Sequence, residues 1–401
     1  MLIYRFAISL FAIATLMRTP RDERGDRLGH GQGAQQPHIW WHAASVGELV
    51  STRAVLERLL AERPDLHVLV TTNTATAQDE LRRWHLPRVS GRLAPLDLAW
   101  VTARMMRRWH VVVHVSLEAE LWPNRVLKCP GPVILLGARF SAKTAKGWRK
   151  LPAFARLILD RVSYVSAQDA ASADRLVTLG LPAAKLGPTV SLKAFYEPRL
   201  PKADETVDGA FDRTKTWLAA STHAGEEDII LDAHLRARRD DPDLTLILAP
   251  RHPDRGDAIA GMIAARGLDV ARRSRGDAPR PGAVYLADTM GEMPRWYAAA
   301  GRVFVGGSLV DRGGHTPYEP AAFDTALIHG PDVANFAAAY EQVGDHVVQI
   351  GDADGLARAL AALRDPDEQI RAGKAAATAL RPIGDIDRVV KDVLALLPPS
   401  A

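Results

Sequence analysis

The chain has 401 residues and a formal net charge of +4, and 47% of its residues are hydrophobic. This length is too great for one ordinary domain and predicts two, each with its own core. The single cysteine, Cys129, excludes a disulfide framework and favours a reducing compartment. The small excess of positive charge favours anionic partners without indicating a nucleic-acid-binding protein.

Residues 2–17 form an apolar stretch, and the basic sequence RTPRDERGDR follows it. The stretch is shorter than the roughly 20 apolar residues of a membrane span, and most of its positive charge follows it, unlike that of a signal peptide. We interpret residues 1–20 as an uncleaved N-terminal membrane anchor, which either spans the bilayer or lies on it. The basic residues would hold this end against anionic lipid on the cytoplasmic side. A helix in the core of the first domain is the alternative.

Short apolar strands alternate with helical stretches in two series along the chain. The first series is expected at residues 38–45, 66–72, 111–116, 132–138 and 164–169, and the second at 217–222, 245–251, 284–288, 303–309 and 326–331. This alternation predicts an α/β fold with parallel sheets covered by helices on both faces.

The sequence between the two series, residues 196–210, is rich in proline and charge and predicts a linker. We therefore expect two doubly wound, Rossmann-like domains, residues 21–195 and 211–401, that face each other across a cleft. The last helix of the second domain could also pack back on the first. Ligands of such sheets bind beyond the carboxyl ends of the strands, so the residues that follow the strands are the candidate site residues.

In the first domain, carboxylates follow two of the expected strands. Glu48 lies in the first helical turn after strand 38–45, where it is either a general base or a group that complements the helix dipole. Glu118 and Glu120 follow strand 111–116, and an extended segment would point them to opposite sides. Lys193, just before the linker, could neutralise a phosphate or carboxylate.

In the second domain, four polar segments follow four strands in order. The segments are AASTHAGEED (219–228), APRHPDR (249–255), ADTMGEMP (287–294) and GGSLVDRGGHTPYEPAA (306–322). Glycine loops that precede helices suit an anion, and Arg251 could form forked bonds to a phosphate. Glu319 and Pro320 are expected to open a helix, from which Glu319 would bind ribose hydroxyls. No cysteine or histidine spacing typical of a metal site occurs.

Taken together, these segments resemble a known family, the 3-deoxy-D-manno-octulosonic acid (Kdo) transferases of lipopolysaccharide synthesis. The resemblance covers nearly the whole chain and rests on WHAASVGE, LEAELWPN, GARFSAKTAKGWRK, SLKAF, AASTHAGEE, LAPRHPDR, DTMGEM and GGSLVDRGGHTPYEPAA. Where Thr316 and Tyr318 stand, the family usually has Asn and a Leu-like residue.

The resemblance implies an inverting glycosyltransferase of the GT-B fold that needs no metal and no cofactor. It would transfer Kdo from CMP-Kdo to a tetraacyl lipid A precursor at the cytoplasmic face of the inner membrane. By the resemblance, Glu48 is the general base, and Glu118 and Lys193 stabilise the transition state. The CMP-binding segments would be Pro250-Arg251, Met290-Gly291-Glu292 and Thr316-Pro317-Tyr318-Glu319.

Three alternatives stay open on the sequence. The donor could be a UDP-sugar, or the sugar could be a related eight-carbon acid. The chain could also be a membrane-bound sugar-nucleotide binder without activity. The intact Glu48, Glu118, Lys193 and Arg251 argue against this last alternative.

Overall fold

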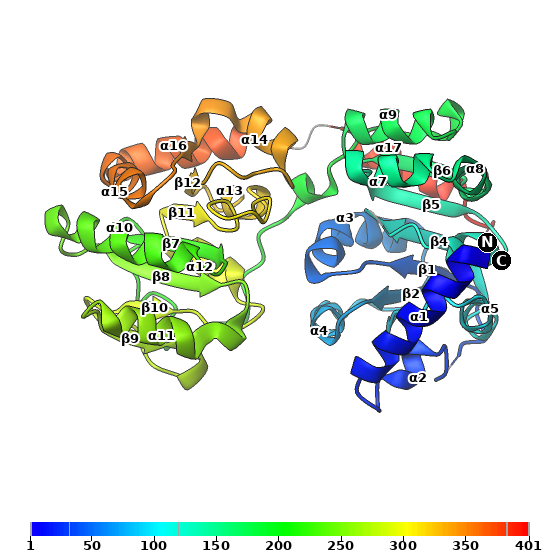
Figure 1. Ribbon diagram of the computed structural model, residues 1–401, viewed down its shortest axis with the longest axis horizontal. Helices are drawn as coiled ribbons and strands as arrows, with labels where there is room; N and C mark the ends of the chain where they lie inside the picture. The colour runs from blue at the N-terminus through cyan, green and yellow to red at the C-terminus, as the bar shows by residue number, and fades with distance from the viewer. Residues whose placement is uncertain (1, 32, 119, 382–383, 400–401) are drawn as a thin grey trace. The chain divides into compact units, whose positions relative to one another are not determined.

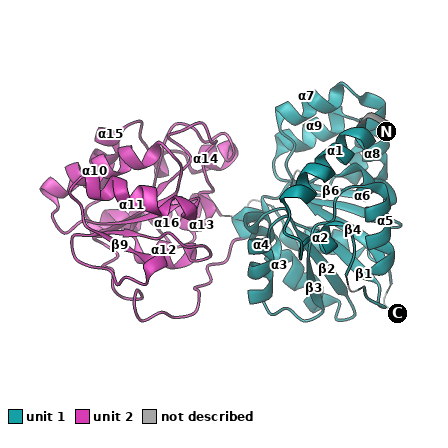
Figure 2. Ribbon diagram, turned by 60° about the horizontal axis from the view of Figure 1, so that its bottom comes forward, with its two compact units in different colours: residues 1–195, 382–401 teal, residues 196–381 magenta. Residues whose placement is uncertain are grey.

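The structure, a computed structural model, describes residues 2–31, 33–118, 120–381 and 384–399. Its contacts divide the chain into two compact units (Figure 2). Unit 1 comprises residues 1–195 together with 382–401, and unit 2 comprises residues 196–381. The expected linker, residues 196–210, thus groups with unit 2. The last helix groups with unit 1, as in the alternative that the sequence left open.

Unit 1 is built on a parallel sheet with the strand order β3-β2-β1-β4-β5-β6, which is the order of a Rossmann fold (Figure 1). Its strands are β1 (His38–His42), β2 (His67–Thr72), β3 (Val89–Leu93), β4 (Val111–Leu117), β5 (Val133–Ala138) and β6 (Tyr164–Ala167). Its helices are α1 (Leu2–Arg18), α2 (Arg24–Arg27), α3 (Val46–Glu62), α4 (Ala75–Arg83), α5 (Ala99–Arg108), α6 (Pro123–Lys128), α7 (Ala142–Arg149), α8 (Pro152–Arg161), α9 (Ala170–Thr178) and α17 (Ile386–Leu394), with the 3-10 turns η1 (Ala183–Lys185) and η2 (Leu192–Phe195).

Unit 2 repeats this plan with one additional strand. Its sheet is parallel and has the order β13-β12-β11-β7-β8-β10-β9. The strands are β7 (Thr216–Thr222), β8 (Thr245–Pro250), β9 (Val270–Arg272), β10 (Val284–Leu286), β11 (Arg302–Val305), β12 (Ala326–His329) and β13 (Val348–Gln349). The helices are α10 (Glu226–Asp240), α11 (Gly256–Ala265), α12 (Met293–Ala299), α13 (Tyr318–Ala321), α14 (Ala337–Val343), α15 (Ala353–Ala362) and α16 (Pro366–Ala379), with the turns η3 (Pro253–Arg255), η4 (Arg273–Arg275) and η5 (Gly344–His346). The predicted α/β class with two parallel sheets is confirmed.

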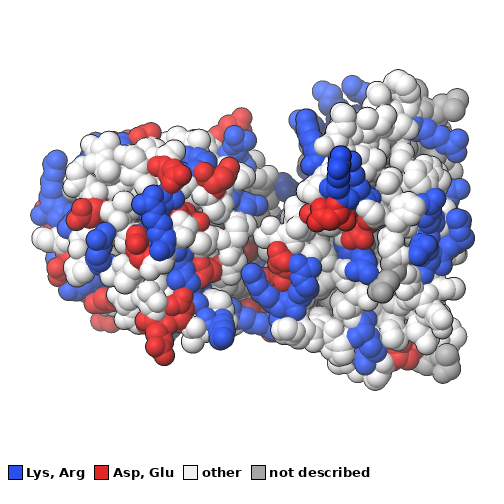
Figure 3. All heavy atoms as spheres, turned by 90° about the horizontal axis from the view of Figure 1, so that it is seen from below, with Lys and Arg blue, Asp and Glu red and all other residues white. Residues whose placement is uncertain are grey.

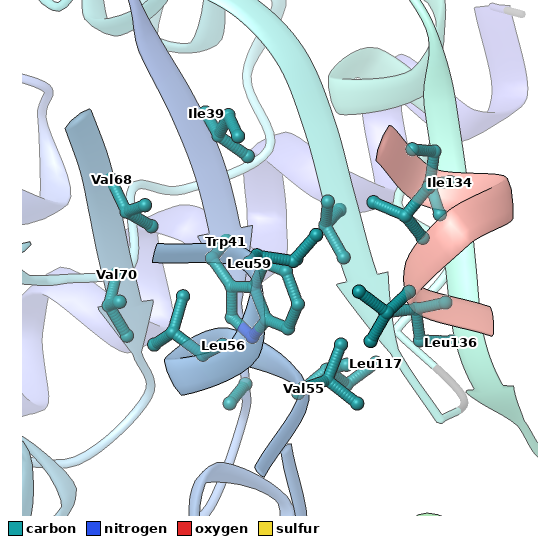
Figure 4. Close-up of a cluster of buried hydrophobic side chains, with 14 of the residues drawn as sticks. Ile39, Trp41, Val55, Leu56, Leu59, Val68, Val70, Leu117, Ile134 and Leu136 are labelled. Atoms are coloured by element: carbon teal, nitrogen blue, oxygen red, sulfur yellow. The ribbon is translucent and has the colours of Figure 1, made fainter. Parts of the chain in front are cut away.

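The core of unit 1 fills both faces of its sheet, because alternate side chains of a strand point to opposite faces. Trp41 of β1 packs against Leu56 and Leu59 of α3 on one face, whereas its neighbour Trp40 belongs to the cluster on the other face (Figure 4). Helix α17, drawn red, joins the first cluster beside Ile134 (Figure 4). It contributes the buried side chains Ile386, Val389, Val390 and Val393. These contacts make α17 part of the core of unit 1.

Helix α1 covers part of unit 1 with one face and exposes the other. Ile8 and Ala12 are buried, and the hydroxyl of Tyr4 donates a hydrogen bond to Asp97 Oδ2 at 2.5 Å. The opposite face leaves large apolar side chains more than half exposed, namely Phe6, Leu10, Ile13 and Met17. In the described part of the chain, no helix combines the length and apolar character that crossing a membrane requires. The membrane anchor at residues 1–20 stays a prediction.

Candidate active site

The predicted site residues of unit 1 lie where the strand order reverses. The chain runs outward from β1 through β2 and β3 and then returns to β4 on the other side of β1. In open parallel sheets, ligands bind at this switch point, beyond the carboxyl ends of the two strands. Glu48 follows β1, and Glu118 and Glu120 follow β4. The fold therefore brings Glu48 to the same edge of the sheet as Glu118 and Glu120, which are about 70 residues further along the chain.

Glu48 is held by the N-terminus of α3. Ser45 caps this helix by accepting a hydrogen bond from the Glu48 N–H, and Glu48 Oε2 accepts one from the Ala44 N–H at 2.8 Å. This reciprocal arrangement resembles a capping box, in which the third residue of a helix reaches back to a backbone N–H near the cap. The cap fixes the direction of the side chain at the edge of the sheet. Glu48 thus has a structural role at the start of α3, and this role is compatible with a chemical one.

The surroundings of Glu48 favour its protonated form. Burial, then the negative charge of Glu118 and to a smaller extent that of Glu120, raise its pKa to about 8, against the effects of the Ala44 N–H and Lys193. A carboxylate with a pKa near neutrality is a stronger base than a solvated one and can accept a proton from a hydroxyl group. This property distinguishes Glu48 from an ordinary capping residue.

Glu118 and Lys193 form an ion pair in the same region. The Lys193 Nζ lies 2.6 Å from Glu118 Oε1, and both side chains are largely buried. Lys193 lies in turn η2, which packs against α3. This packing brings the lysine to the end of β4, although η2 lies about 75 residues further along the chain. Glu118 has a φ of 48°, a backbone conformation that is uncommon for a residue with a side chain. Such strain is concentrated at functional sites.

Glu120 makes different contacts from Glu118, although both follow β4. His42 Nε2, from β1, lies 3.3 Å from Glu120 Oε2, and the Trp122 indole N–H donates to the same oxygen. Burial alone would raise the pKa of Glu120, but the hydrogen bonds from His42 and Trp122 outweigh it and lower the pKa to about 2. Burial lowers the pKa of His42 to about 4. The structure thus shows an ionised Glu120 in contact with a neutral His42, which the sequence did not predict.

In unit 2 the strand order reverses between β7 and β11, and hydrogen bonds join the segments that follow these strands into one loop structure. Glu226, the first residue of α10, is fully buried and organises it. Its carboxylate accepts hydrogen bonds from the backbone N–H groups of His223, Gly307, Ser308 and Leu309, at 2.7–3.1 Å. The glycine-rich loop is therefore fixed by a buried carboxylate of the neighbouring segment. The sequence predicted this segment as a helix start with an anion site at its backbone amides, and it assigned no role to Glu226.

A second buried carboxylate connects β7 to the segment after β8. Glu227 accepts two hydrogen bonds from Arg255, at 2.7 and 2.9 Å, and one from the Thr222 hydroxyl at 2.9 Å. Pro250 ends β8 beside Thr222, and the exposed Arg251 donates its backbone N–H to Thr222 O. The predicted residues Pro250 and Arg251 thus lie next to the loop structure at the ends of β7 and β11.

The segment after β10 contains Met290, Gly291 and Glu292. Met290 is 46% exposed, and Gly291 has a φ of 84°. Glu292 accepts hydrogen bonds from Arg273 at 2.6–3.2 Å and from the Thr289 hydroxyl at 2.5 Å. The side chain of Glu292 thus holds its own loop through Arg273 and Thr289, whereas Met290 is exposed.

The last predicted segment, residues 316–319, leads into α13. This helix begins at Tyr318, two residues before Pro320, so the proline is not at its first position as expected. Pro317 and Tyr318 are buried, and Thr316 and Glu319 are partly exposed. Glu319 lies near the buried Tyr297, whose pKa burial raises, with a smaller contribution from the charge of Glu319. The structure therefore brings residues 316–319 to the carboxyl end of the sheet, close to Tyr297 of α12.

A metal site was not expected from the sequence. Among the residues that the structure describes, no group of three or more His, Cys, Asp or Glu side chains is placed to bind a metal ion.

The two parallel sheets, each with a switch point, define a class of protein by fold, the α/β proteins of the GT-B type. The structure is similar to a putative UDP-N-acetylglucosamine 2-epimerase from Listeria monocytogenes, with a TM-score of 0.61 over 90% of this chain and 96% of the other. The sequence identity is 10%, so this likeness concerns the fold alone.

Sequence comparison identifies the family. Residues 22–195 match the family described as 3-Deoxy-D-manno-octulosonic-acid transferase (kdotransferase). The chain is 33% identical to the 3-deoxy-D-manno-octulosonic acid transferase of Haemophilus influenzae, over 87% of this chain and 84% of the relative. It is 36% identical to the enzyme of the same name from Bordetella pertussis, over 74% and 72%. The chain belongs to the Kdo transferase family and is a glycosyltransferase. The donor used by this family is CMP-Kdo.

Proposed function

We propose that this chain transfers Kdo from CMP-Kdo to a tetraacyl lipid A precursor in lipopolysaccharide biosynthesis, with inversion at the anomeric carbon. Membership of the family supports the sugar and the donor. The observation that carries the mechanism is the set of three carboxylates at the switch point of unit 1, among which Glu48 has a pKa of about 8.

In this proposal, Glu48 is the general base. It accepts the proton of an acceptor hydroxyl while the oxygen of that hydroxyl forms a bond to the anomeric carbon of Kdo. The bond from this carbon to the phosphate of CMP breaks, and CMP leaves with the electron pair. Positive charge develops on the sugar in the transition state, and the Glu118 carboxylate would stabilise it while Lys193 balances the negative charge.

The nucleotide is assigned to unit 2. Its glycine-rich loop, Arg251 and the backbone of Met290-Gly291 would bind CMP, and Glu319 would bind the ribose. The leaving group carries one phosphate, which Arg251 and loop N–H groups can neutralise. We therefore propose that the transfer step needs no metal ion.

Unit 1 is proposed to bind the acceptor at the cytoplasmic face of the inner membrane. It carries 29 Lys and Arg residues against 18 Asp and Glu, whereas unit 2 carries 22 against 29. In Figure 3 the blue side chains of Lys and Arg are more frequent than the red ones over unit 1, at the right. This charge suits the phosphates of lipid A and anionic lipid. The exposed apolar face of α1 suits insertion among lipid chains as a surface helix.

The test is a transfer assay with the full chain, a tetraacyl lipid A precursor and CMP-Kdo, followed by mass spectrometry of the lipid. A product that is heavier by one or more Kdo residues is expected, and addition of EDTA should not reduce its formation. Strict dependence on a divalent cation would contradict the metal-free step.

The same assay separates the alternatives. Parallel reactions with UDP-sugars and with the CMP ester of a related eight-carbon acid are expected to give no product. Transfer from one of these donors only would replace the proposed donor. Binding of CMP-Kdo without transfer to any lipid precursor would favour a sugar-nucleotide binder.

A further inference from the structure

Two histidines of unit 2 contact each other edge to edge. His223 follows β7, His315 lies in the glycine-rich loop after β11, and their Nε2 atoms are 3.0 Å apart. The ring planes differ by 10° and the ring centroids are 5.2 Å apart, which is the geometry of an in-plane hydrogen bond. Such a contact needs one hydrogen, so one Nε2 donates and the other accepts. The resting pair therefore consists of two neutral imidazoles in different tautomers.

The backbone holds the pair in place. Both rings pack against Gly307, whose φ is +68°, and a Cβ atom there would lie 3.1 Å from His315 Cδ2 and 3.3 Å from His223 Cδ2. The glycine-rich loop is in turn fixed by Glu226, and Glu226 also accepts the backbone N–H of His223. The pair thus lies at the switch point of unit 2, where one buried carboxylate binds the backbone of both segments that carry the histidines.

The charged groups around the pair are mostly positive. Arg251 and His252 face it from the segment after β8, and Arg312 faces it from the glycine-rich loop. On the other side are the carboxylates of Glu226 and Glu227 from α10, which are already bound to backbone N–H groups and to Arg255. Burial, His223 and Arg251 lower the pKa of His315 to about 4, and burial also lowers the pKa of His223. An additional positive charge on the pair would thus face mostly positive neighbours, and the two carboxylates of α10 already have other partners.

We propose that the His223–His315 pair takes up one proton when the phosphate of the nucleotide binds beside it. The proton comes from solvent and adds to Nδ1 of the imidazole that donates through Nε2. The hydrogen bond between the rings is kept and becomes charge-assisted, which strengthens it. The phosphate supplies the missing negative charge and offsets the repulsion from Arg251 and His252. This inference rests on the proposed assignment of CMP to unit 2.

Calorimetry of the full chain tests the proposal, because proton uptake makes the measured binding enthalpy depend on the ionisation enthalpy of the buffer. The probes are CMP and its methyl phosphodiester, whose phosphate does not titrate near neutral pH. We expect both probes to bind with uptake of up to about one proton at pH 7, so affinity falls by at most about tenfold per unit of pH. His315→Gln and His223→Gln should each abolish the uptake. His346→Gln, an exposed histidine in η5, should retain it.

The outcomes separate this inference from the function on which it rests. Binding of the diester to the wild-type chain without proton uptake would overturn the inference and leave the nucleotide site in place. Uptake that persists in both variants, or that only His252→Gln abolishes, would also overturn it. Absence of CMP binding would overturn the nucleotide site as well. Should the variants fail to fold, the imidazole ¹⁵N shifts of the wild-type chain, with and without CMP, give the same answer.

Discussion

Glu48 caps α3 and is also the proposed general base, and the pH dependence that follows from its pKa distinguishes the two roles. If Glu48 is the base, only its ionised form accepts the proton, so the single-turnover rate should rise with pH up to about 8 and then level off. Glu48→Gln keeps the bond to the Ala44 N–H but should slow the chemical step by about 10²–10⁴-fold and remove this pH dependence. A residue that only caps α3 would give a nearly normal rate.

The raised pKa also has a consequence for stability. A group whose pKa is higher in the folded chain stabilises it fully below the pKa of the unfolded chain and loses this contribution as pH rises through the folded value. The melting temperature of the wild-type chain should therefore fall, relative to that of Glu48→Gln, as the pH rises from roughly 5 to 9. The glutamine of the variant does not titrate. Parallel melting curves of the two proteins measure this directly.

The charges around Glu48 predict opposite shifts of the same pH profile. Glu118 raises the pKa of Glu48 and Lys193 lowers it. Glu118→Gln should thus move the midpoint of the rate profile to lower pH, and Lys193→Met should move it to higher pH. Both variants should also be slower, because each loses half of an ion pair. Midpoints that coincide with the wild-type value in both variants would show that Glu48 does not control the profile.

The site residues that could be predicted from the sequence differ from those that could not in how they relate to the strands. Glu48, Glu118 and Lys193 could be proposed because each follows a recognisable strand or precedes the linker. Glu226 and Glu227 could not, because a carboxylate at a helix start ordinarily faces solvent, and only the folded loops show that both are buried. The contact of His42 with Glu120 joins residues that are 78 positions apart, which no local pattern reports.

Among the elements, the strands that the sequence missed are β3, β9 and β13. All three are edge strands: β3 ends the sheet of unit 1, and β13 and β9 are the two ends of the sheet of unit 2. Strand β3 (VSGRL) is mostly half-buried, and β9 and β13 have three and two residues. Because an edge strand needs less apolar surface than a central one, its sequence lacks the continuous apolar run that identified the others.

Helix α17 provides a test at the scale of one element. Ile386 is 4% exposed in the core of unit 1, although it follows the whole of unit 2 in the sequence. Ile386→Ala should lower the free energy of unfolding of unit 1 by about 2–5 kcal/mol, the usual loss for a large aliphatic side chain. The affinity for CMP, assigned to unit 2, should not change. A melting transition that loses stability together with CMP affinity would instead place α17 in unit 2.

At the scale of the whole molecule, the unequal charge of the two units predicts how the chain meets a membrane. Binding to vesicles that contain anionic lipid should weaken as ionic strength rises from about 0.1 M to 1 M, because the Debye length falls from roughly 10 Å to 3 Å. Phe6→Ser with Leu10→Ser should weaken binding at every salt concentration, because these side chains form the exposed face of α1. Equal sedimentation of wild-type and variant protein with vesicles would contradict the role of α1.

The return of α17 to unit 1 also orders the events of synthesis. During translation, all residues of unit 2 leave the ribosome before the last core helix of unit 1 does. Until residues 386–394 are made, unit 1 exposes the apolar surface that α17 covers. Helix α17 packs against α3, the helix that carries the proposed base Glu48. Unit 1 is therefore begun first and completed last, and catalytic competence should await the docking of α17.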